Sequence, residues 1–283
     1  MSLSIYEYRP MLIFFTAIAV VFGAVMGSFL NCAAWRIAHG ESFLKGRSHC
    51  PNCGHVLGPL ELIPVLSWVI QGGKCKGCGQ KISIRYPLTE LGFACVTVAC
   101  LLRFDLTVLC LRNYIFLCCL FCLSLVDLEI CEIPDGCHVV NVLAWVAAMP
   151  FTFVSWPDTA LHVLAAVVYG GGVLLISNVL DKVLGRESLG GGDVKLLAVV
   201  GLYLGMVGTL FALMLACVFG LIVFAARRGS RGEKKQDNGT DQDSETETGG
   251  KAFPFGPSIS LAAGLMLLFG EPLVNWYIGL LGL

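Results

Sequence analysis

The chain has 283 residues, of which 56% are hydrophobic and only 14% are charged, and its formal net charge at pH 7 is −1. Globular domains carry about 25% charged residues, so this composition excludes a soluble protein and indicates one that crosses a membrane several times. The net charge says nothing about partners, because in a membrane protein the distribution of charge between loops is what matters.

Apolar windows of about 20 residues, long enough to cross the hydrocarbon of a bilayer, divide the chain into predicted spans. Residues 11–34 form the first span, and they lack the basic start and the cleavage site of a signal peptide, so we expect a retained helix. Further single spans are expected at residues 88–104, 113–130, 137–156, 160–181 and 256–282.

Residues 193–226 are apolar but too long for one crossing. Gly201, Gly205 and Gly208 offer a place to turn, so we expect two short spans there. The predicted fold class is therefore all-α, a polytopic membrane protein of about eight transmembrane helices. Its predicted domains are a first helix (1–34), a cytoplasmic module (35–87), a transmembrane catalytic core of helices two to seven (88–226), a cytoplasmic flexible loop (227–255) and a last helix (256–283).

Two CxxC pairs between the first and second spans give the strongest metal signal in the chain. They are Cys50 with Cys53 in CPNC and Cys75 with Cys78 in CKGC. Gly54 and Gly79 directly follow the two pairs and relieve backbone strain at each tight turn. Four thiolates in this pattern predict one tetrahedral zinc ion with no open position, which makes the site structural rather than catalytic.

Disulfides, a redox role or the absence of metal are the alternatives for these four cysteines. His49 and His55 adjoin the first pair, and either could replace a cysteine as ligand. The module also contains apolar side chains that suit a small folded unit, namely Ile63, Leu66, Trp68, Val69 and Ile70. The other ten cysteines lie in or beside apolar spans without knuckle spacing, and we expect them to pack as small hydrophobic residues.

The basic residues predict the orientation of the protein. All but three of the 19 Lys and Arg residues lie in, or next to, the loops 35–87, 131–136, 182–192 and 227–255, which share one side of the membrane under the predicted spans. The positive-inside tendency makes that side cytoplasmic and places both termini outside. A cytoplasmic module in turn argues against disulfides between its cysteines. Residues 227–251 contain no aromatic or large aliphatic side chain, so we expect a disordered, solvated connector.

Two carboxylates, Asp127 and Asp193, interrupt apolar segments that we expect to meet the cytoplasmic face. An Asp at the centre of a membrane helix costs about 2.5–3.5 kcal/mol, so its presence near a span needs a reason. Asp193 follows Gly190, Gly191 and Gly192 and opens a helix, so capping that helix is a fair alternative role. No capping role suggests itself for Asp127.

Two carboxylates close together cannot easily both ionise, so one acts as a base toward water while the other, protonated, acts as an acid toward a carbonyl oxygen. The three glycines would let an extended substrate strand approach the backbone closely. Hydrolysis of a peptide bond at the membrane surface follows as the hypothesis. Asp135 is a third candidate, although a turn or N-cap role is expected for it. Lys195 would contact a substrate carboxylate or simply extend to the interface.

Several motifs along nearly the whole chain match one family. They are GSFLNCAAWR (27–36), the two CxxC pairs, IPVLSW (63–68), GGKCKGC (72–78), ISIRYPLTEL (82–91), the Asp127 to Asp135 segment, GGGDVKL (190–196) and PFGPSISLA (254–262). With these motifs the chain resembles the type IV prepilin leader peptidases, which are bifunctional enzymes of the bacterial inner membrane.

The resemblance implies cleavage of the leader of prepilins and pseudopilins after a Gly at the cytoplasmic membrane face, followed by N-methylation of the new terminus with S-adenosylmethionine. It implies that Asp127 and Asp193 are the catalytic pair, and it leaves the role of Asp135 less certain. No residue pattern shows a methyl donor site, and Glu90, where the module re-enters the membrane, stays unassigned. We expect protein substrates and membrane lipid as partners, and no nucleic acid.

Two other functions remain open from the residues themselves. A peptidase without methyltransferase activity would carry the same carboxylates. A proton- or cation-coupled transporter would also use paired intramembrane carboxylates, but it would be expected to show inverted repeats and broken helices near the membrane midplane, and the sequence shows no convincing repeat.

Overall fold

A computed structural model describes residues 9–42, 46–153, 155–184, 190–234 and 254–281. The chain forms two compact units, the first made of Met1–Ile130 with Pro134–Ser155 and the second of Cys131–Ile133 with Trp156–Leu283. Within the described ranges every long element is an α-helix, and β-structure is limited to two isolated bridges. The prediction of an all-α membrane protein is confirmed.

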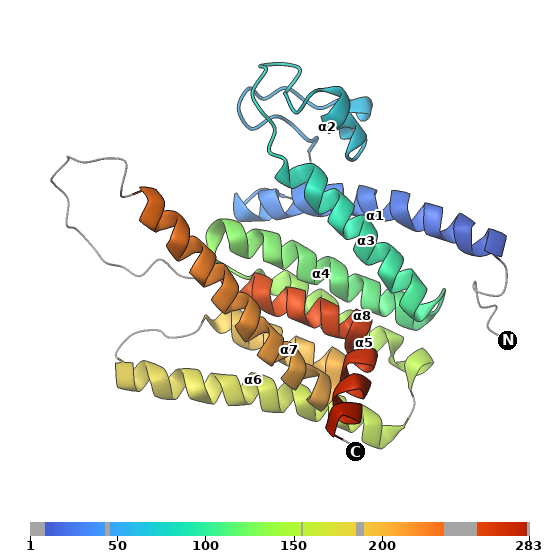
Figure 1. Ribbon diagram of the computed structural model, residues 1–283, viewed down its shortest axis with the longest axis vertical. Helices are drawn as coiled ribbons and strands as arrows, with labels where there is room; N and C mark the ends of the chain where they lie inside the picture. Colours follow the sequence, from blue (N-terminus) through green and yellow to red (C-terminus); the bar gives the residue numbers. More distant parts are fainter. Residues whose placement is uncertain (1–8, 43–45, 154, 185–189, 235–253, 282–283) are drawn as a thin grey trace. The chain divides into compact units, whose positions relative to one another are not determined.

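The first unit holds four long helices and the module that contains the CxxC pairs (Figure 1). The long helices are α1 (Arg9–Ala38), α3 (Arg85–Phe104), α4 (Val108–Ile130) and α5 (Asp135–Thr152). The module connects α1 to α3 and contains two short helices, η2 (Pro59–Leu62) and α2 (Leu66–Ile70). Because both ends of the module join helix ends, its position depends directly on how α1 and α3 pack together.

Small residues bring α1 and α3 into close contact. A Cβ atom placed on Gly23 would lie 2.5 Å from Thr97 Oγ1 and 2.8 Å from Ala94 Cα, so only glycine fits there. One turn later, Gly27 packs in the same way against Glu90 and Phe93. In lipid the hydrophobic effect does not drive helices together, so their association depends on close van der Waals packing. Small residues at such positions allow that close approach.

Polar and apolar contacts then fix the register of these helices. Asn31 Nδ2 donates to Thr89 Oγ1 at 2.7 Å and to Gly27 O at 3.0 Å. Beside this contact lies the buried core of the unit, built from α1, α3 and α4 by Leu30, Ala34, Phe93, Cys122, Leu125 and Val126. Hence α1, α3 and α4 form a packed frame, and the module is attached to that frame.

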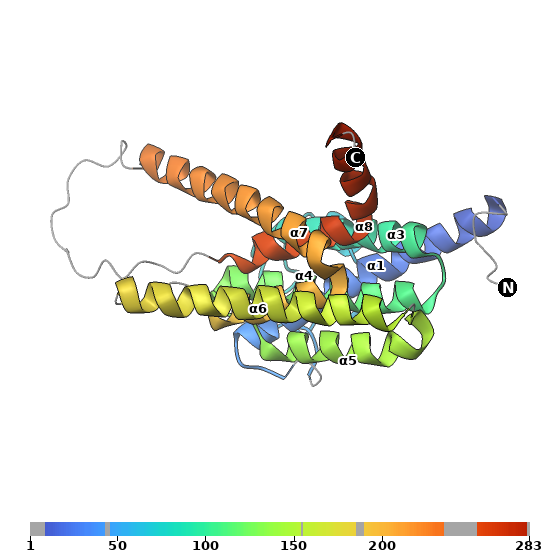
Figure 2. The ribbon, with the colours of Figure 1, turned by 90° about the horizontal axis from the view of Figure 1, so that it is seen from below.

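The second unit consists of α6 (Trp156–Leu184), α7 (Gly191–Lys234) and α8 (Gly256–Leu281). Its longest helix, α7, is broken at Gly205, which has φ 67° and ψ −169°. Figure 2 shows the change of direction along α7. The turn predicted within residues 193–226 is therefore confirmed, and Gly205 is the glycine that makes it.

Side chains of α6 satisfy carbonyl groups near the break. His162 Nδ1 donates to Leu202 O at 3.0 Å, and the Tyr169 hydroxyl donates to Met206 O at 2.7 Å. Within α7, Thr209 Oγ1 donates to Gly205 O at 2.6 Å. An unpaired backbone carbonyl inside a membrane costs several kcal/mol, so these three donors make the break tolerable.

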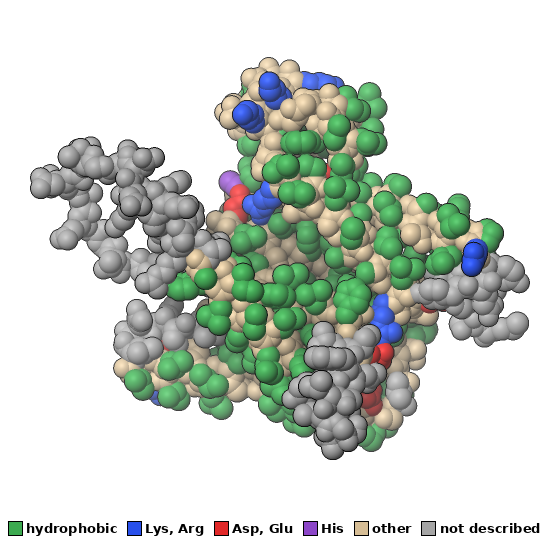
Figure 3. All heavy atoms as spheres, viewed as in Figure 1, with side chains coloured by type: hydrophobic (Ala, Val, Ile, Leu, Met, Phe, Trp, Pro, Cys, Tyr) green, Lys and Arg blue, Asp and Glu red, His purple; other side chains and the backbone are tan. Residues whose placement is uncertain are grey.

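Five described helices are long and apolar enough to cross a membrane. They are α1, α3 and α4, Trp156–Val183 of α6 and Gly191–Ala225 of α7. On the face drawn in Figure 3, hydrophobic side chains cover much of the helical surface, and individual ones are widely exposed, Phe14 by 61% and Val21 by 65%. Apolar side chains exposed on this scale indicate lipid as the solvent of these helices.

The helix limits differ from the predicted spans at several ends, and α1, α3, α4 and α6 all extend beyond the predicted limits. Helix α5 ends at Thr152 rather than at residue 156, and it is not among the five helices that meet the length and hydropathy needed for a span. Helix α8, Gly256–Leu281, agrees with the predicted last span at residues 256–282. Helix α7 continues to Lys234, so the first residues of the 227–251 loop, expected to be disordered, are helical. Residues 235–253 of that loop lie outside the described residues.

Candidate metal centre and catalytic carboxylates

The four predicted zinc ligands come together in the module of the first unit. The Sγ atoms of Cys50, Cys53, Cys75 and Cys78 all lie within 4.8 Å of one another, and the Cys53 and Cys75 sulfurs are 4.0 Å apart. Four sulfurs around a tetrahedral zinc ion, each about 2.3 Å from the metal, need separations of this kind. The donor set therefore fits a structural zinc ion, as the spacing predicts.

The two CxxC turns are built in the same way. In the first, Cys50 N–H donates to His55 O and Gly54 N–H donates to Cys50 O, both at 2.9 Å. In the second, Cys75 N–H donates to Gln80 O and Gly79 N–H donates to Cys75 O, again at 2.9 Å. Gly54 and Gly79 have φ angles of 70° and 71°, a conformation that strains any residue with a Cβ atom. The predicted role of both glycines is confirmed.

Backbone N–H groups aimed at the sulfurs favour thiolates. Such a donor at Gln80 lowers the pKa of Cys78 to about 7, and donors at Cys53 and Asn52 lower the pKa of Cys50. At Cys53 the His55 backbone N–H acts in the same direction, but burial and the neighbouring thiols outweigh it and raise the pKa to about 11. A metal cation bound by all four sulfurs would remove the proton that remains on the Cys53 thiol.

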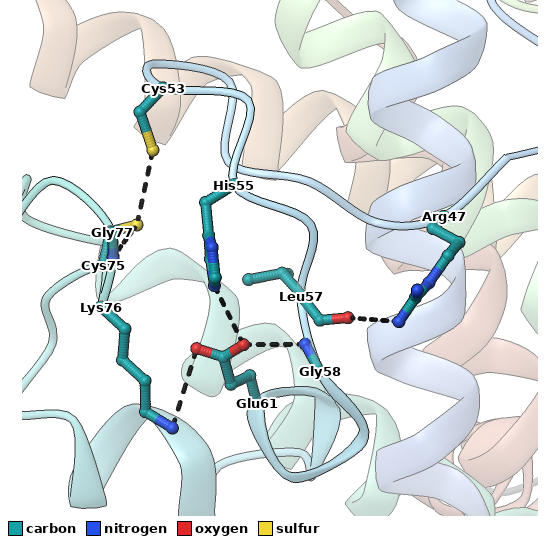
Figure 4. Close-up of polar contacts among 9 residues, drawn as sticks. All are labelled: Arg47, Cys53, His55, Leu57, Gly58, Glu61, Cys75, Lys76 and Gly77. Atoms are coloured by element: carbon teal, nitrogen blue, oxygen red, sulfur yellow. Dashed lines mark hydrogen bonds and ion pairs between the residues drawn. The ribbon is translucent and has the colours of Figure 1, made fainter.

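A carboxylate stands behind the first CxxC turn (Figure 4). Glu61 Oε2 accepts from Gly58 N–H at 2.7 Å and lies 3.2 Å from His55 Nε2, while Glu61 Oε1 lies 3.8 Å from Lys76 Nζ. The Gly58 N–H is the main reason that the pKa of Glu61 is lowered. His55 is directed to Glu61, and the group of potential ligands among the described residues contains neither His55 nor His49. The alternative of a histidine ligand is thus not supported.

The module has little hydrophobic core of its own. Four of the five apolar residues expected to pack inside it are exposed, namely Ile63, Leu66, Val69 and Ile70. Only Trp68 is anchored, by an Nε1–H donated to Ile82 O at 3.1 Å and by Gly73, whose added Cβ would lie 2.9 Å from the indole ring. A unit of this size with so little core depends on its metal for stability.

Glu90, which the sequence left unassigned, holds the module against α3. Its Oε2 accepts the backbone N–H of Val65 at 2.7 Å, and the side chain is buried. Val65 has φ 62°, an unfavourable angle for a β-branched residue, and it directly precedes α2. The charge-assisted hydrogen bond from Val65 helps to hold this conformation.

Asp127 and Asp193 belong to different units. Asp127 lies on α4, one turn before its end at Ile130, and is only 4% exposed. Asp193 lies in the first turn of α7, where its N–H donates to Gly190 O at 3.1 Å. Since α7 begins at Gly191, Asp193 is inside the helix, not at the N-cap position, and its carboxylate is placed where the helix dipole favours negative charge.

The glycines before Asp193 are not equivalent. A Cβ atom on Gly192 would lie 2.9 Å from Ile133 Cβ, so the space beside this glycine is filled by the protein itself. At Gly191 no other described atom lies within 4 Å of such a Cβ, and at Gly190 only Asp193 does. Gly192 therefore serves internal packing, and the role of Gly190 and Gly191 in admitting a substrate stays a prediction.

The two supporting candidates lie on helix surfaces. Asp135 is exposed and is the first residue of α5, where Pro134 occupies the N-cap position. An N-cap role for Asp135 is therefore wrong by one residue, although its carboxylate still lies in the favourable first turn. Lys195 is exposed on α7, two residues after Asp193.

Comparison with known proteins identifies the family. The chain is 36% identical over 230 residues to the prepilin leader peptidase/N-methyltransferase of Myxococcus xanthus, which covers 79% of this chain and 68% of that protein. It is 30% identical over 283 residues to the protein of the same name from Bacillus subtilis, covering 93% and 97% of the two chains. The chain belongs to the type IV prepilin leader peptidase family.

The family match divides at the helices described above. Residues 21–104 match the bacterial peptidase A24 N-terminal domain, which takes in most of α1, the module and α3. Residues 114–225 match the type IV leader peptidase family itself, and this stretch contains both Asp127 and Asp193. The protein from Pseudomonas putida, with the same name, is 29% identical over 95% of this chain and 96% of its own length. No solved structure matches the chain significantly.

Proposed function

We propose that this member of the prepilin leader peptidase family is a bifunctional enzyme of the bacterial inner membrane. It removes the leader of type IV prepilins and pseudopilins after a Gly, and then N-methylates the exposed residue with S-adenosylmethionine. The observation that carries this proposal is the alignment with relatives named prepilin leader peptidase/N-methyltransferase along 93–95% of this chain. The same alignment favours the enzyme over a cation-coupled transporter.

In the proposed cleavage reaction one of the residues Asp127 and Asp193 acts as general base and the other as general acid. The ionised carboxylate takes a proton from water as the water attacks the scissile carbonyl carbon, and the protonated one donates to the carbonyl oxygen. Asp193 lies in the first turn of α7, where the helix dipole favours a negative charge, so we assign the base to Asp193 and the acid to Asp127.

The supporting residues have separate roles in this proposal. Gly190 and Gly191 admit the extended substrate strand, and Lys195 contributes positive charge beside the same helix start. Asp135 lies in the first turn of α5, where its negative charge stabilises the helix. The zinc ion held by Cys50, Cys53, Cys75 and Cys78 keeps the module folded and does not touch the substrate.

The proposed orientation places the module and both catalytic carboxylates at the cytoplasmic face, with the termini outside. Its support is the concentration of Lys and Arg in one set of loops, and Figure 3 shows several of these side chains on the module. A prepilin leader is made in the cytoplasm, so the enzyme would meet its protein substrates at this face. Membrane lipid is the other partner.

The test incubates the detergent-purified chain with a prepilin and S-adenosylmethionine labelled on its methyl group, and follows cleavage and methylation in the same tube. We expect both activities from the parent protein. Asp127→Asn and Asp193→Asn should each remain inserted and zinc-loaded yet cleave at less than about a thousandth of the parent rate, as for loss of an acid or base. Normal processing by either variant would disprove the aspartyl mechanism. Cleavage by the parent protein without transfer of the label would show that it is a peptidase without methyltransferase activity.

A further inference from the structure

A cavity of about 290 Å³ lies within the first unit, between the module and the helices that carry it. It is lined by α1 through Asn31, Trp35 and Arg36 and by α3 through Tyr86 and Glu90, with module residues closing the other side. This volume is close to the lower end of the range of small-molecule sites, about 300 Å³, which suits a ligand that fills the cavity. Its lining residues are scattered between positions 28 and 90, which is why no sequence motif revealed it.

Aromatic rings form much of the wall. Trp35 packs nearly parallel to His39, with ring centroids 4.2 Å apart, and meets His49 edge-on at 5.9 Å. Trp68 is fixed by its hydrogen bond to Ile82 O, and Tyr86 completes the aromatic lining. Rings held in place by neighbours in this way suit stacking against a heteroaromatic base, and their faces attract a cation.

Buried charges of both signs line the same cavity. Arg36, in the last turn of α1, is 6% exposed, and Glu90 is 7% exposed. One oxygen of Glu90 accepts the Val65 N–H, and the carboxylate of Glu61 is held by Gly58 and His55. A simple anion would face two carboxylates here and a simple cation would face Arg36, whereas a ligand that carries both charges meets a complementary partner for each.

We propose that this cavity binds the methyl donor, S-adenosylmethionine. The inference rests on the proposed methyltransferase function and supplies the donor site that the sequence does not show. The donor combines an adenine ring, a cationic sulfonium and ammonium, and a carboxylate, and the cavity offers aromatic rings, buried carboxylates and a buried guanidinium. Arg36 pairs with the donor's carboxylate, Glu90 faces its positive charge, and Trp35 or Tyr86 stacks on the adenine.

The experiment measures equilibrium binding of labelled S-adenosylmethionine to the zinc-loaded, detergent-purified full chain. Arg36→Gln and Glu90→Gln should each raise the Kd at least about tenfold, as expected for loss of one charge-assisted contact. A Gln at position 90 can still accept the Val65 N–H, and an unchanged zinc content shows that the module stays folded. Arg103→Gln and Asp105→Asn, at the opposite end of α3, are the matched controls and should leave the Kd unchanged.

Ultraviolet cross-linking of the labelled donor gives a second readout, and the label should appear in peptides that contain Trp35 or Tyr86. Unchanged binding by both cavity variants, or label confined to peptides outside the cavity, would overturn the assignment while leaving the methyltransferase function intact. A parent chain that cleaves prepilin but binds no donor would instead refute the methyltransferase half of the proposed function, and this inference with it.

Discussion

At the residue scale, glycines show what sequence can and cannot settle. Gly54 and Gly79 were predictable because a CxxC turn requires a left-handed residue at one fixed position, and both adopt it. Gly192 was not predictable, because its neighbour Ile133 is far away in sequence and only folding brings the two together. Positions set by local geometry can be read from a motif, and positions set by packing cannot.

The same distinction applies to the carboxylates of the module. Glu61 stands three positions after the N-cap residue Gly58 of η2, which is the spacing of a capping box, whereas Glu90 has no recognisable spacing; each accepts a backbone N–H at 2.7 Å. The partner N–H groups belong to Gly58 and Val65, and the second of these is 25 positions away from its acceptor. For Glu90 the only signal in the sequence was its acidic side chain beside an apolar segment, because a carboxylate that becomes buried needs a hydrogen-bond partner.

We predict that zinc is structural and held by four thiolates. The purified chain should contain about one zinc ion, the capacity of a single four-cysteine site, and Cys50→Ser combined with Cys53→Ser should abolish it. The module should then become sensitive to limited proteolysis, because it has little hydrophobic core. Cys95→Ser, on the exposed surface of α3, is the control that should retain full zinc. A folded, protease-resistant module without metal would contradict this prediction.

At the element scale, hydropathy located most helices but not their exact ends or breaks. The apolar window that predicts a span does not include the extra turns of α1 and α6. Polar residues near the membrane interface continue these helices but do not raise the hydropathy of the sequence. The break in α7 was predictable as one of three glycines. Which one bends depends on His162 and Tyr169, whose hydrogen bonds to α7 lie outside any local pattern.

The close packing of α1 on α3 leads to a prediction about Gly23. Its replacement by Ala should lower the thermal stability of the purified protein by about 1–3 kcal/mol, because the new methyl group overlaps Thr97 and the α3 backbone. Gly92→Ala, on α3, is the matched control, since no described atom lies within 4 Å of its added Cβ, and a helical Ala there should be neutral or stabilising. Equal thermal unfolding of the two variants would argue against this helix contact.

The hairpin between α3 and α4 can be tested chemically. Cys100 Sγ and Cys110 Sγ are 3.9 Å apart, so a modest movement would bring them to the bond length of about 2.05 Å. We expect copper phenanthroline to join them, the oxidant taking two electrons and solvent two protons, so that a peptide pair linked through Cys100 and Cys110 appears in a digest made without reductant. Cys100→Ser should abolish this linked pair and Cys95→Ser should not. Absence of the linked pair from the oxidised parent would show that the helix ends do not meet.

At the scale of the whole molecule, the family could be recognised from sequence because its motifs are short, local and in a fixed order. The structure resolves two units, and each contains one of the two proposed catalytic carboxylates. Local motifs identify such residues singly, since each sits at a helix end that its own segment defines. The donor cavity could not be found in this way, because it exists only when α1, the module and α3 are assembled.

The orientation of the molecule in its membrane gives the last prediction. If all but three of the 19 Lys and Arg residues flank one face because that face is cytoplasmic, both termini must lie outside. Alkaline phosphatase folds only after export, because it needs disulfides that the cytoplasm does not sustain. Fused after Leu283 it should be active in intact cells, whereas the same enzyme inserted at residue 240 should be inactive. A cytoplasmic fluorescent reporter at the two positions should give the reverse result. Activity at residue 240 would invert the topology and remove the proposed carboxylates from the compartment in which prepilins are made.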